Sequence, residues 1–399
     1  MSSPIRRSVV IVQHAGDYAE AYRRIRSGSG ETYYAQSYSL DVVGALVSPT
    51  TAVTTICCSS ELDEDTVLDN GVRVINLRAQ EQVDEDRVWR LIRECGATHL
   101  LLRTPQNQVL RQALADPSIE SVLLTLADSF GSEGLRNRVR AWRMRRLFNH
   151  PKVAWIGNHG INSSESLRRI GVDPARIVPW DWPHDITPHQ FTAKASRAER
   201  PWSLLFVGAV VETKGIGDVL RALRALKDKG IAVRLSYAGK GDTAAYAALA
   251  TELQIADQVS YLGLVKHSAV IPLMRDADLV IVPSRHEYPE GFPMTIYEAL
   301  SSRTPIVASD HPMYGRHLGE TKAAFIYPAG DHQALAAAIE TLMAEPARYA
   351  ALSNASAASW DRLQLPVTWG KLMTDWLLPL PEQRSALSKY ALAAYPPKA

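Results

Sequence analysis

The regular alternation of short β-branched runs with helical patterns is the feature that most constrains the fold of this chain. Runs such as Ser8–Gln13 and Leu279–Val282 have the length and composition of strands, and segments with apolar residues at helical spacing follow them. Parallel strands need a crossover connection, which is usually a helix, so repeated units of this kind favour parallel sheets covered by helices. The sequence therefore predicts an α/β protein.

One long interruption divides this pattern into two halves. Residues 173–201 contain five prolines and show no periodicity, which indicates a linker, and the pattern restarts at Trp202. Two Rossmann-like β/α/β domains that face a cleft are the expected architecture. The predicted parts are an N-terminal domain at 1–180, a linker at 181–201, a C-terminal domain at 202–365, and a C-terminal helix and tail at 366–399 that can return to the N-terminal domain.

Composition limits the partners and the compartment. The 44 Lys and Arg residues nearly balance the 42 Asp and Glu residues, so we expect no nucleic-acid partner. Three cysteines, Cys57, Cys58 and Cys95, cannot all pair, which fits a reducing compartment. The apolar run Ser8–Gln13 is too short for a signal peptide, and no run of about 18 apolar residues follows. We expect a cytoplasmic protein.

The glycine-rich loops argue against the common dinucleotide and triphosphate sites. The loop that begins at Gly239 reads GKGDTA after an expected strand, but the acidic residue that should follow about 20 residues later is missing. The loop at Gly28 and Gly30 lacks a third glycine, and no GxxxxGK[ST] motif is present. These observations disfavour a dinucleotide fingerprint and a P-loop.

A different loop offers a phosphate site. Residues 206–215 read FVGAVVETKG, with Gly208 after an expected strand and Lys214 at an expected helix start. Gly208 permits close backbone approach, and a helix N-terminus together with an ammonium group suits a diphosphate. A tight turn with a solvated lysine is the alternative interpretation.

The segment 283–300, PSRHEYPEGFPMTIYEAL, carries the strongest chemical pattern. Glu290 lies just before an expected helix and Glu298 lies one turn into it, so both can face one ligand. A carboxylate accepts hydrogen bonds from the neighbouring hydroxyls of a ribose or a hexose. The amides of Phe292, Met294 and Thr295 can point at phosphate oxygens. Two solvated glutamates are the alternative, but the apolar residues of this helix indicate burial.

At this segment the chain resembles the retaining GT-B glycosyltransferases of family 4. The resemblance covers residues 200–345, and residues 8–180 less closely. It rests on the two glutamates in EGFPMTIYEAL, the preceding DADLVIVPS and the following RTPIVASD. It implies that Glu290 lies by the donor sugar and Glu298 binds the nucleotide ribose. Gly208 and Lys214 match the GRxxxxKG element, which implies that Lys214 holds the diphosphate, and Leu264 lies near the nucleobase.

The resemblance implies a retaining transfer of a hexose-type sugar from a nucleotide sugar, UDP or GDP, to a hydroxyl acceptor. The setting would be bacterial polysaccharide, glycolipid or secondary-metabolite glycosylation, with no cofactor and no metal. The expected catalytic residues are Glu290, Lys214 and Asp128. The expected donor-binding residues are Gly208, Lys214, Gly239, Leu264, Glu290, Gly291, Phe292, Met294, Thr295 and Glu298. The expected acceptor-side residues are Gly28, Gly30, Glu31 and Thr32 at a helix start, together with His14.

The chain departs from the family pattern at three positions. Ala209 replaces the arginine expected near Lys214, so Arg285 or Arg316 would have to meet part of the diphosphate charge. Ala127 replaces a histidine, and Trp180 replaces an asparagine. A catalytically impaired GT-B-like protein that binds a nucleotide or a glycan is therefore the alternative. A nucleotide-sugar epimerase would need acids and histidines that the first half does not supply in a recognisable pattern.

Two further kinds of segment in the sequence are strongly charged. The acidic triplets at 63–65 and 84–86 are expected in a linker and at a helix start, where solvated caps are favoured over metal ligands. Residues 135–147, LRNRVRAWRMRRL, contain six arginines and no acid, with Leu135, Val139 and Trp142 at helical spacing. This pattern suits peripheral contact with an anionic membrane. An outer helix with solvated arginines is the alternative.

Overall fold

The computed structural model describes residues 7–14, 16–32, 34–80, 82–131, 135–198 and 201–395. The chain divides into two compact units, each built around one sheet. Unit 1 comprises Met1–Glu31, Ala35–Pro183 and Leu365–Ala399, and unit 2 comprises Thr32–Tyr34 and His184–Gln364. The C-terminal helices therefore belong to the same unit as the N-terminal strands.

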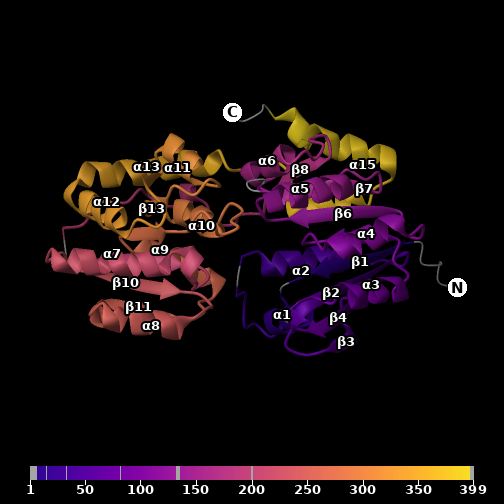
Figure 1. The fold of residues 1–399 in the computed structure, drawn as a ribbon, viewed down its shortest axis with the longest axis horizontal. Coiled ribbons are helices and arrows are strands. Elements are labelled where there is room, and N and C mark those ends of the chain that lie inside the picture. The colour runs from indigo at the N-terminus through magenta and orange to yellow at the C-terminus, as the bar shows by residue number, and fades with distance from the viewer. Residues whose placement is uncertain are drawn as a thin grey trace. The chain divides into compact units, whose positions relative to one another are not determined.

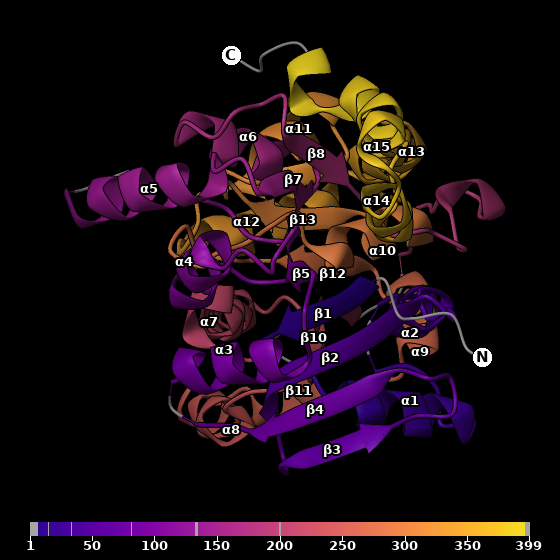
Figure 2. The same cartoon turned by 90° about the vertical axis from the view of Figure 1, so that its right-hand side faces the viewer.

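The described residues of unit 1 form an eight-stranded sheet in the order β3-β4-β2-β1-β5-β6-β7-β8. All pairs are parallel except the antiparallel pair of β3 and β4 at one edge. Figure 2 shows β3, β4, β2 and β1 side by side in this order. The strands are β1 Arg7–Gln13, β2 Thr51–Ser60, β3 Glu64–Val67, β4 Arg73–Arg78, β5 His99–Leu102, β6 Ser121–Leu126, β7 Val153–His159 and β8 Ile177–Trp180.

Helices cover both faces of this sheet, because its central strands are apolar on both sides. One face packs against α3 Glu85–Glu94, α4 Asn107–Ala115, α5 Leu135–Phe148 and α6 Ile161–Arg169. The other face packs against α1 Tyr18–Arg26, α2 Gln36–Ala45, α14 Trp369–Trp376 and α15 Leu380–Leu387. Figure 1 shows α15 in yellow among the purple elements of this unit. The 3-10 helices η4 Ser388–Tyr390 and η5 Leu392–Ala394 follow.

The described residues of unit 2 form a fully parallel six-stranded sheet in the order β11-β10-β9-β12-β13-β14. The strands are β9 Trp202–Val207, β10 Val233–Ala238, β11 Val259–Tyr261, β12 Leu279–Val282, β13 Ile306–Ser309 and β14 Ala324–Tyr327. The strand order reverses between β9 and β12. The loops after these two strands diverge there, which is where open α/β sheets bind ligands.

Two helical layers cover this second sheet as well. One core contains residues of α7 Ile216–Asp228, α8 Thr243–Glu252 and α12 His332–Ala344, and the other contains residues of α9 His267–Asp276, α10 Met294–Ser302 and α11 Gly315–Thr321. Helix α13 Pro346–Asp361 contributes Tyr349 and Leu352 to the first core and Trp360 to the second. The 3-10 helices are η1 Pro188–Gln190, η2 Glu212–Lys214 and η3 Ala256–Gln258.

The two parallel sheets confirm the predicted α/β class, but some local expectations were wrong. The proline-rich interruption contains β8, since a proline is tolerated in an edge strand. The 63–65 triplet lies at the start of edge strand β3 and not in a linker. None of the helices in the described part of the chain combines the length and the apolar character that crossing a bilayer requires.

Candidate functional site

The candidate site of unit 2 lies at the carboxyl edge of its sheet, where β9 and β12 are neighbours. Lys214 follows β9, and Glu290 follows β12. Between them, Gly215 adopts a φ of +79°, and a Cβ at this position would collide with the carbonyl oxygen of Pro283. Only glycine fits such a close approach at positive φ. The loop that carries Lys214 therefore packs directly against the end of β12.

Lys214 and Glu290 form an ion pair in this corner. The Lys214 ammonium donates to Oε1 of Glu290, and the hydroxyl of Ser284 donates to the same oxygen at 2.7 Å. Glu290 is only 6% exposed, so these two donors replace the water that its carboxylate has lost. The ring centre of Tyr288 lies 4.5 Å from Nζ of Lys214, a cation-π distance. Lys214 and Glu290 thus contact each other as an ion pair, and Ser284 and Tyr288 help to orient them.

Glu298 forms a second buried contact one turn into α10. Its Oε1 lies 3.2 Å from Nδ1 of His267, which begins α9. Burial raises the pKa of the Glu298 carboxyl, and the hydrogen bond from His267 opposes that shift. The ring of Tyr34 meets His267 edge to face at 4.8 Å, and the Tyr34 hydroxyl lies 2.5 Å from Nδ1 of His184. An aromatic wall therefore borders Glu298.

A cavity of about 270 Å³ opens beside these groups. At its base, the Thr295 hydroxyl donates to the carbonyl of Val207 at 3.2 Å and ties the start of α10 to β9. Gly239 has a φ of +143°, and a Cβ there would collide with the carbonyl oxygen of Gly208, so these two loops are in backbone contact. The cavity is lined by Thr32, Tyr34, Val207, Gly208, Ala238, Gly239, Leu264, Val265, His267, Val270, Met294, Thr295 and Glu298.

The lining brings together several predicted donor residues: Gly208, Gly239, Leu264, Met294, Thr295 and Glu298. Helix α10 begins at Met294 with Pro293 as its N-cap, so the amides of Met294 and Thr295 have no partner within the helix. Gly291 and Phe292 lie in the preceding loop. The Phe292 side chain is buried 5.3 Å from the ring of Tyr297, which leaves its backbone as the part that can meet a ligand.

Arg285 or Arg316 was expected to replace the arginine that is absent at Ala209, but both are already paired with carboxylates of the protein. Arg285 donates from Nε and a terminal nitrogen to the two carboxylate oxygens of Asp218, both at 2.8 Å. This pairing raises the pKa of the Arg285 guanidinium. Arg316 is exposed and donates to Glu320 at 2.7 Å. Lys214 is therefore the predicted cation that the structure places in the corner with Glu290.

The candidate residues of unit 1 lie at the carboxyl edge of the other sheet. His14 follows β1 and is exposed, whereas Asp128 follows β6 and is partly buried. Burial raises the pKa of the Asp128 carboxyl, and Arg140 opposes that shift. The backbone carbonyl of Asp128 accepts a hydrogen bond at 3.0 Å from the side-chain amide of Asn158, at the end of β7. This bond fixes the loop that carries Asp128.

The sequence predicted that Gly28, Gly30 and Glu31 lie at a helix start, and this was wrong. Gly28 and Gly30 have φ values of +81° and +79°, which keep the chain out of a right-handed helix, and α2 begins only at Gln36. The Glu31 carboxylate accepts from the amide of Ser37 at 2.5 Å, inside the first turn of α2. Thr32 also precedes α2 in the chain, and it lines the cavity of unit 2.

Some residues of these edges were missed by the sequence analysis. Ser284 and Tyr288 lie inside the segment 283–300. The polar residues of that segment other than its two glutamates could therefore have indicated them. His267 lies three positions after Leu264. In unit 1, Nε2 of His159 lies 2.9 Å from Asp181, and both side chains are buried. These histidines carry no local signal, because their partners are distant in sequence.

The acidic triplets are occupied by partners within unit 1. Asp63, Glu64 and Asp65 pair with Arg87, Arg23 and Arg73 respectively. Asp84 caps α3, and Glu85 and Asp86 accept hydrogen bonds from the start of α4. In the described parts of the chain, no three His, Cys, Asp or Glu side chains gather in a way that could hold a metal ion.

Helix α5 presents an exposed basic face. Ala141, Met144 and Phe148 pack into the core, whereas Val139 and Trp142 are 51% and 54% exposed. Arg138, Arg140, Arg143, Arg145 and Arg146 are exposed as well, and the Arg146 guanidinium lies 5.0 Å from the Trp142 ring centre. The side chain of Leu135 lies outside the described residues. Apolar and cationic groups therefore share one exposed surface, which we call the α5 surface.

Comparison with known proteins relates most of unit 2 to a known family. Residues 189–358 match the family of glycosyl transferases group 1. The amylovoran biosynthesis glycosyltransferase AmsK of Erwinia amylovora is 29% identical over 157 residues, which are 38% of this chain and 39% of that protein. The phosphatidyl-myo-inositol mannosyltransferase of Mycobacterium leprae is 32% identical over 142 residues, 35% of this chain and 37% of that protein. The matches span less than half of these relatives.

Solved structures resemble this chain over nearly its whole length. The sucrose-phosphate synthase of Thermosynechococcus elongatus aligns with a TM-score of 0.64 at 18% identity and covers 93% of this chain and 98% of its own. Anabaena HepE, solved in complex with UDP, aligns with a TM-score of 0.62 at 15% identity and covers 90% and 95%. Residues 189–358 thus match the glycosyl transferases group 1 family, and the chain as a whole has the GT-B fold.

Proposed function

We propose that this chain is a retaining glycosyltransferase that moves a hexose-type sugar from a nucleotide sugar to a hydroxyl acceptor. The observation that carries this proposal is the arrangement at the carboxyl edge of unit 2. A cavity of about 270 Å³ contains Glu298 and the start of α10, and the nearby corner between β9 and β12 holds the Lys214–Glu290 pair. The cavity suits a nucleoside, the helix start suits a diphosphate and the carboxylates suit sugar hydroxyls.

The nucleoside would occupy the cavity beside α10. Apolar side chains such as Val207, Val265 and Val270 can pack on the base, and Glu298 can accept hydrogen bonds from both ribose hydroxyls. His267 already donates to Glu298 and so favours the charged carboxylate that would receive these hydroxyls. The expected ribose role of Glu298 is therefore supported by a partner that the sequence did not reveal.

The diphosphate would lie at the start of α10 and meet Lys214. When the bond between the anomeric carbon and the phosphate breaks, negative charge grows on the diphosphate, and fixed cations and amides lower that barrier. Lys214 Nζ and the amides of Met294 and Thr295 can supply this stabilisation without a metal. Glu290 orients Lys214 in the resting protein and can accept a hydroxyl of the transferred sugar. We assign no covalent nucleophile.

The acceptor would meet the carboxyl edge of unit 1. Asp128 is the candidate that can accept a hydrogen bond from the attacking hydroxyl, because its carboxyl has a raised pKa and its loop is fixed by Asn158. His14 is exposed at the end of the first strand and can add a polar contact. Retention requires the hydroxyl to approach on the face from which the diphosphate leaves.

UDP-sugars are the first donors to test, because HepE was solved with UDP and with UDP-glucose. AmsK is named for amylovoran biosynthesis, which favours a polysaccharide acceptor for this chain too. Thermal-shift screening of UDP-glucose, UDP-galactose, GDP-mannose and ADP-glucose would identify the donor. A ligand at about 100 times its dissociation constant adds about 2.7 kcal/mol of stability. Release of nucleoside diphosphate in the presence of an acceptor would then establish transfer.

A second candidate function is a GT-B-like protein that binds a nucleotide or glycan without turnover. Two observations favour it: Ala209 removes one cation from the diphosphate site, and Arg285 is held by Asp218. Such a protein would be stabilised by a nucleotide sugar but would release no nucleoside diphosphate with any acceptor. The donor screen followed by a turnover assay separates the two functions.

The α5 surface supports peripheral contact with an anionic membrane. Exposed Val139 and Trp142 can enter the interface while the surrounding arginines meet lipid phosphates. One of the relatives is named as a mannosyltransferase of phosphatidyl-myo-inositol, a lipid acceptor. For this chain we therefore propose that an acceptor in the glycolipid class would be reached from a membrane surface through α5.

A further inference from the structure

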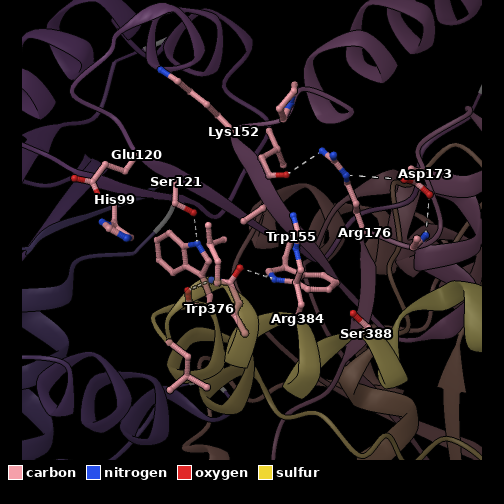
Figure 3. A pocket seen from close by; sticks show the side chains of 17 residues that line it. His99, Glu120, Ser121, Lys152, Trp155, Asp173, Arg176, Trp376, Arg384 and Ser388 are labelled. Atoms are coloured by element: carbon pink, nitrogen blue, oxygen red, sulfur yellow. Dashed lines mark hydrogen bonds and ion pairs between the residues drawn. The ribbon is translucent and has the colours of Figure 1, made fainter.

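A second cavity, of about 480 Å³, lies in unit 1 at the amino ends of its parallel strands, the edge opposite to His14 and Asp128. Figure 3 shows residues from the starts of β5, β6 and β7 on one side and residues of the C-terminal helices on the other. Its volume falls within the range of small-molecule sites, about 300–1,000 Å³. Aromatic side chains such as Trp155 and Trp376 and charged side chains such as Glu120 and Arg384 line it.

The base of this cavity is fixed by side-chain hydrogen bonds between the strands and the C-terminal helices. The indole of Trp376 donates to the hydroxyl of Ser121 at 2.8 Å, and the indole of Trp155 donates to Oε1 of Gln383 at 3.1 Å. The amide of Gln383 in turn donates to the carbonyl of Trp376. Trp155, Trp376 and Gln383 are all buried. The cavity is therefore preformed, and a ligand would not have to order its base.

Most cationic groups around the cavity already have hydrogen-bond or ion-pair partners within the protein. Arg176 donates to the carbonyl of His150 at 3.0 Å and lies 3.9 Å from Asp173, and Lys152 donates to a backbone carbonyl. Burial lowers the pKa of His99 to about 4, which leaves the imidazole neutral near pH 7. His99 can thus give or accept a hydrogen bond but brings no charge.

Arg384 differs from these groups. Its guanidinium makes no hydrogen bond or ion pair with any other residue that the structure describes. In Figure 3 it extends from α15 toward the strands beside Trp155. A guanidinium presents its donors in a planar fork that matches a carboxylate or a phosphate. An open cation at a fixed polar cavity therefore favours an anionic ligand.

We propose that this cavity is a second saccharide site, which takes a sugar that bears a carboxylate or a phosphate. Arg384 would bind the anionic group in a bidentate manner. The carboxylate of Glu120 can accept hydrogen bonds from sugar hydroxyls, and the hydroxyl of Ser388 can donate or accept. The site lies at the edge of the sheet away from the candidate acceptor residues, so it would hold a saccharide that is not the one being glycosylated.

The test is titration of the full-length chain with four probes, followed by ligand-observed NMR: methyl glucuronide, glucose 6-phosphate, methyl glucoside and inorganic phosphate. At least one of the anionic sugars is expected to bind at least tenfold more tightly than methyl glucoside and than phosphate. Binding of the glucuronide identifies a carboxylate ligand, and binding of glucose 6-phosphate identifies a phosphorylated one. Equal binding of methyl glucoside, equal binding of phosphate, or no binding of either anionic sugar would overturn the proposal.

Variants locate the binding. Arg384→Gln should weaken the anionic sugar at least tenfold, and Arg384→Lys should restore part of the affinity, because it keeps the charge but not the planar fork. Arg111→Gln, on the exposed face of α4 in the same unit, is the matched control and should change nothing. Equal affinity in Arg384→Gln would place the sugar elsewhere. UDP should not displace the sugar, and displacement would assign the sugar to the site in unit 2.

UDP affinity should be measured separately in each variant. This measurement distinguishes failure of the saccharide proposal from failure of the proposed function. Arg384→Gln should bind UDP as the unmodified chain does, since Arg384 belongs to the other unit. If the anionic sugar binds through Arg384 while no nucleotide binds, the saccharide site stands and the transferase proposal fails. If the nucleotide binds and neither anionic sugar does, the saccharide proposal fails, and the turnover assay still decides the transferase proposal.

Discussion

The carboxyl edges of the two sheets hold their candidate residues in different ways. In unit 2, Lys214 contacts Glu290 and His267 contacts Glu298, and both glutamates are buried. In unit 1, Asp128 is half-buried on one strand end, and His14 is exposed on another. The carboxyl edge of unit 2, the proposed donor edge, is thus ordered by two charge pairs. The carboxyl edge of unit 1, the proposed acceptor edge, offers separate groups, whose use depends on the molecule that binds there.

The largest effect is expected from Lys214→Ala, which removes the cation of the donor edge. Turnover should fall about 100- to 1,000-fold, because loss of one group that stabilises transition-state charge costs about 2.7–4 kcal/mol. Steady-state kinetics would measure it, with a melting curve to show that the fold persists without the Glu290 partner. Lys240→Ala, on the neighbouring exposed loop, is the matched control. An unchanged rate in a folded Lys214→Ala variant would mean that another cation serves the diphosphate.

On the acceptor unit, the largest effect should come from the α5 surface. Replacing Arg138, Arg143 and Arg145 with glutamine should weaken sedimentation with anionic vesicles about 100-fold, since each basic residue near such a surface contributes about 1 kcal/mol. UDP binding should not change. A triple variant at Arg90, Arg111 and Arg234, which are exposed elsewhere, controls for net charge. If the unmodified protein ignores anionic vesicles at low salt, α5 is a solvated outer helix.

Glu298→Gln probes the ordered edge at its second charge pair. Nucleotide affinity should fall about 10- to 150-fold, because hydrogen bonds to a charged group contribute about 1.5–3 kcal/mol and the amide carries no charge. Titration calorimetry with UDP would measure the loss, and Glu252→Gln, on the exposed end of α8, is the control. Equal affinity for UDP in both variants would remove Glu298 from the nucleotide site.

Asp128→Asn tests whether the acceptor edge contributes to chemistry at all. The rate should fall about tenfold or more while UDP affinity stays the same, since the change lies in the other unit. Burial raises the pKa of Asp128, and the proposed role needs the carboxylate. The transfer rate of the unmodified protein should therefore decline as pH drops through that raised pKa, and the variant should lack this decline. An identical pH profile in both proteins would contradict the role.

The same contrast explains what the sequence could predict. Glu290, Met294, Thr295 and Glu298 fall in one loop and the helix after it, so their spacing alone predicted a shared ligand. The strands and helices around these four residues were predictable too, because the local alternation of strand and helix patterns predicted both sheets. Prediction was strongest where one continuous segment supplies the chemistry.

Contacts between distant segments could not be predicted in this way. Helix α9, strand β12 and a long loop separate His267 from Glu298 in the chain, and His159 and Asp181 meet at the ends of β7 and β8. Such pairs arise from tertiary packing and leave no spacing signal. The turn at Gly28 and Gly30 was misjudged for a different reason: its glycines adopt positive φ, which interrupts the helix that the flanking residues favour.

The smallest effect should be that of a chelator, and it bears on how the donor edge manages charge. Excess EDTA should leave the transfer rate nearly unchanged, because Lys214 and the amides of α10 are proposed to meet the diphosphate. In the first acidic triplet Asp63, Glu64 and Asp65 are each paired with an arginine, and in the second Asp84 caps α3. The rate should be measured before and after EDTA, and again with added Mg²⁺. Complete loss that Mg²⁺ restores would show that a metal carries part of the charge that Ala209 leaves unmet, and the donor edge would then be incomplete without it.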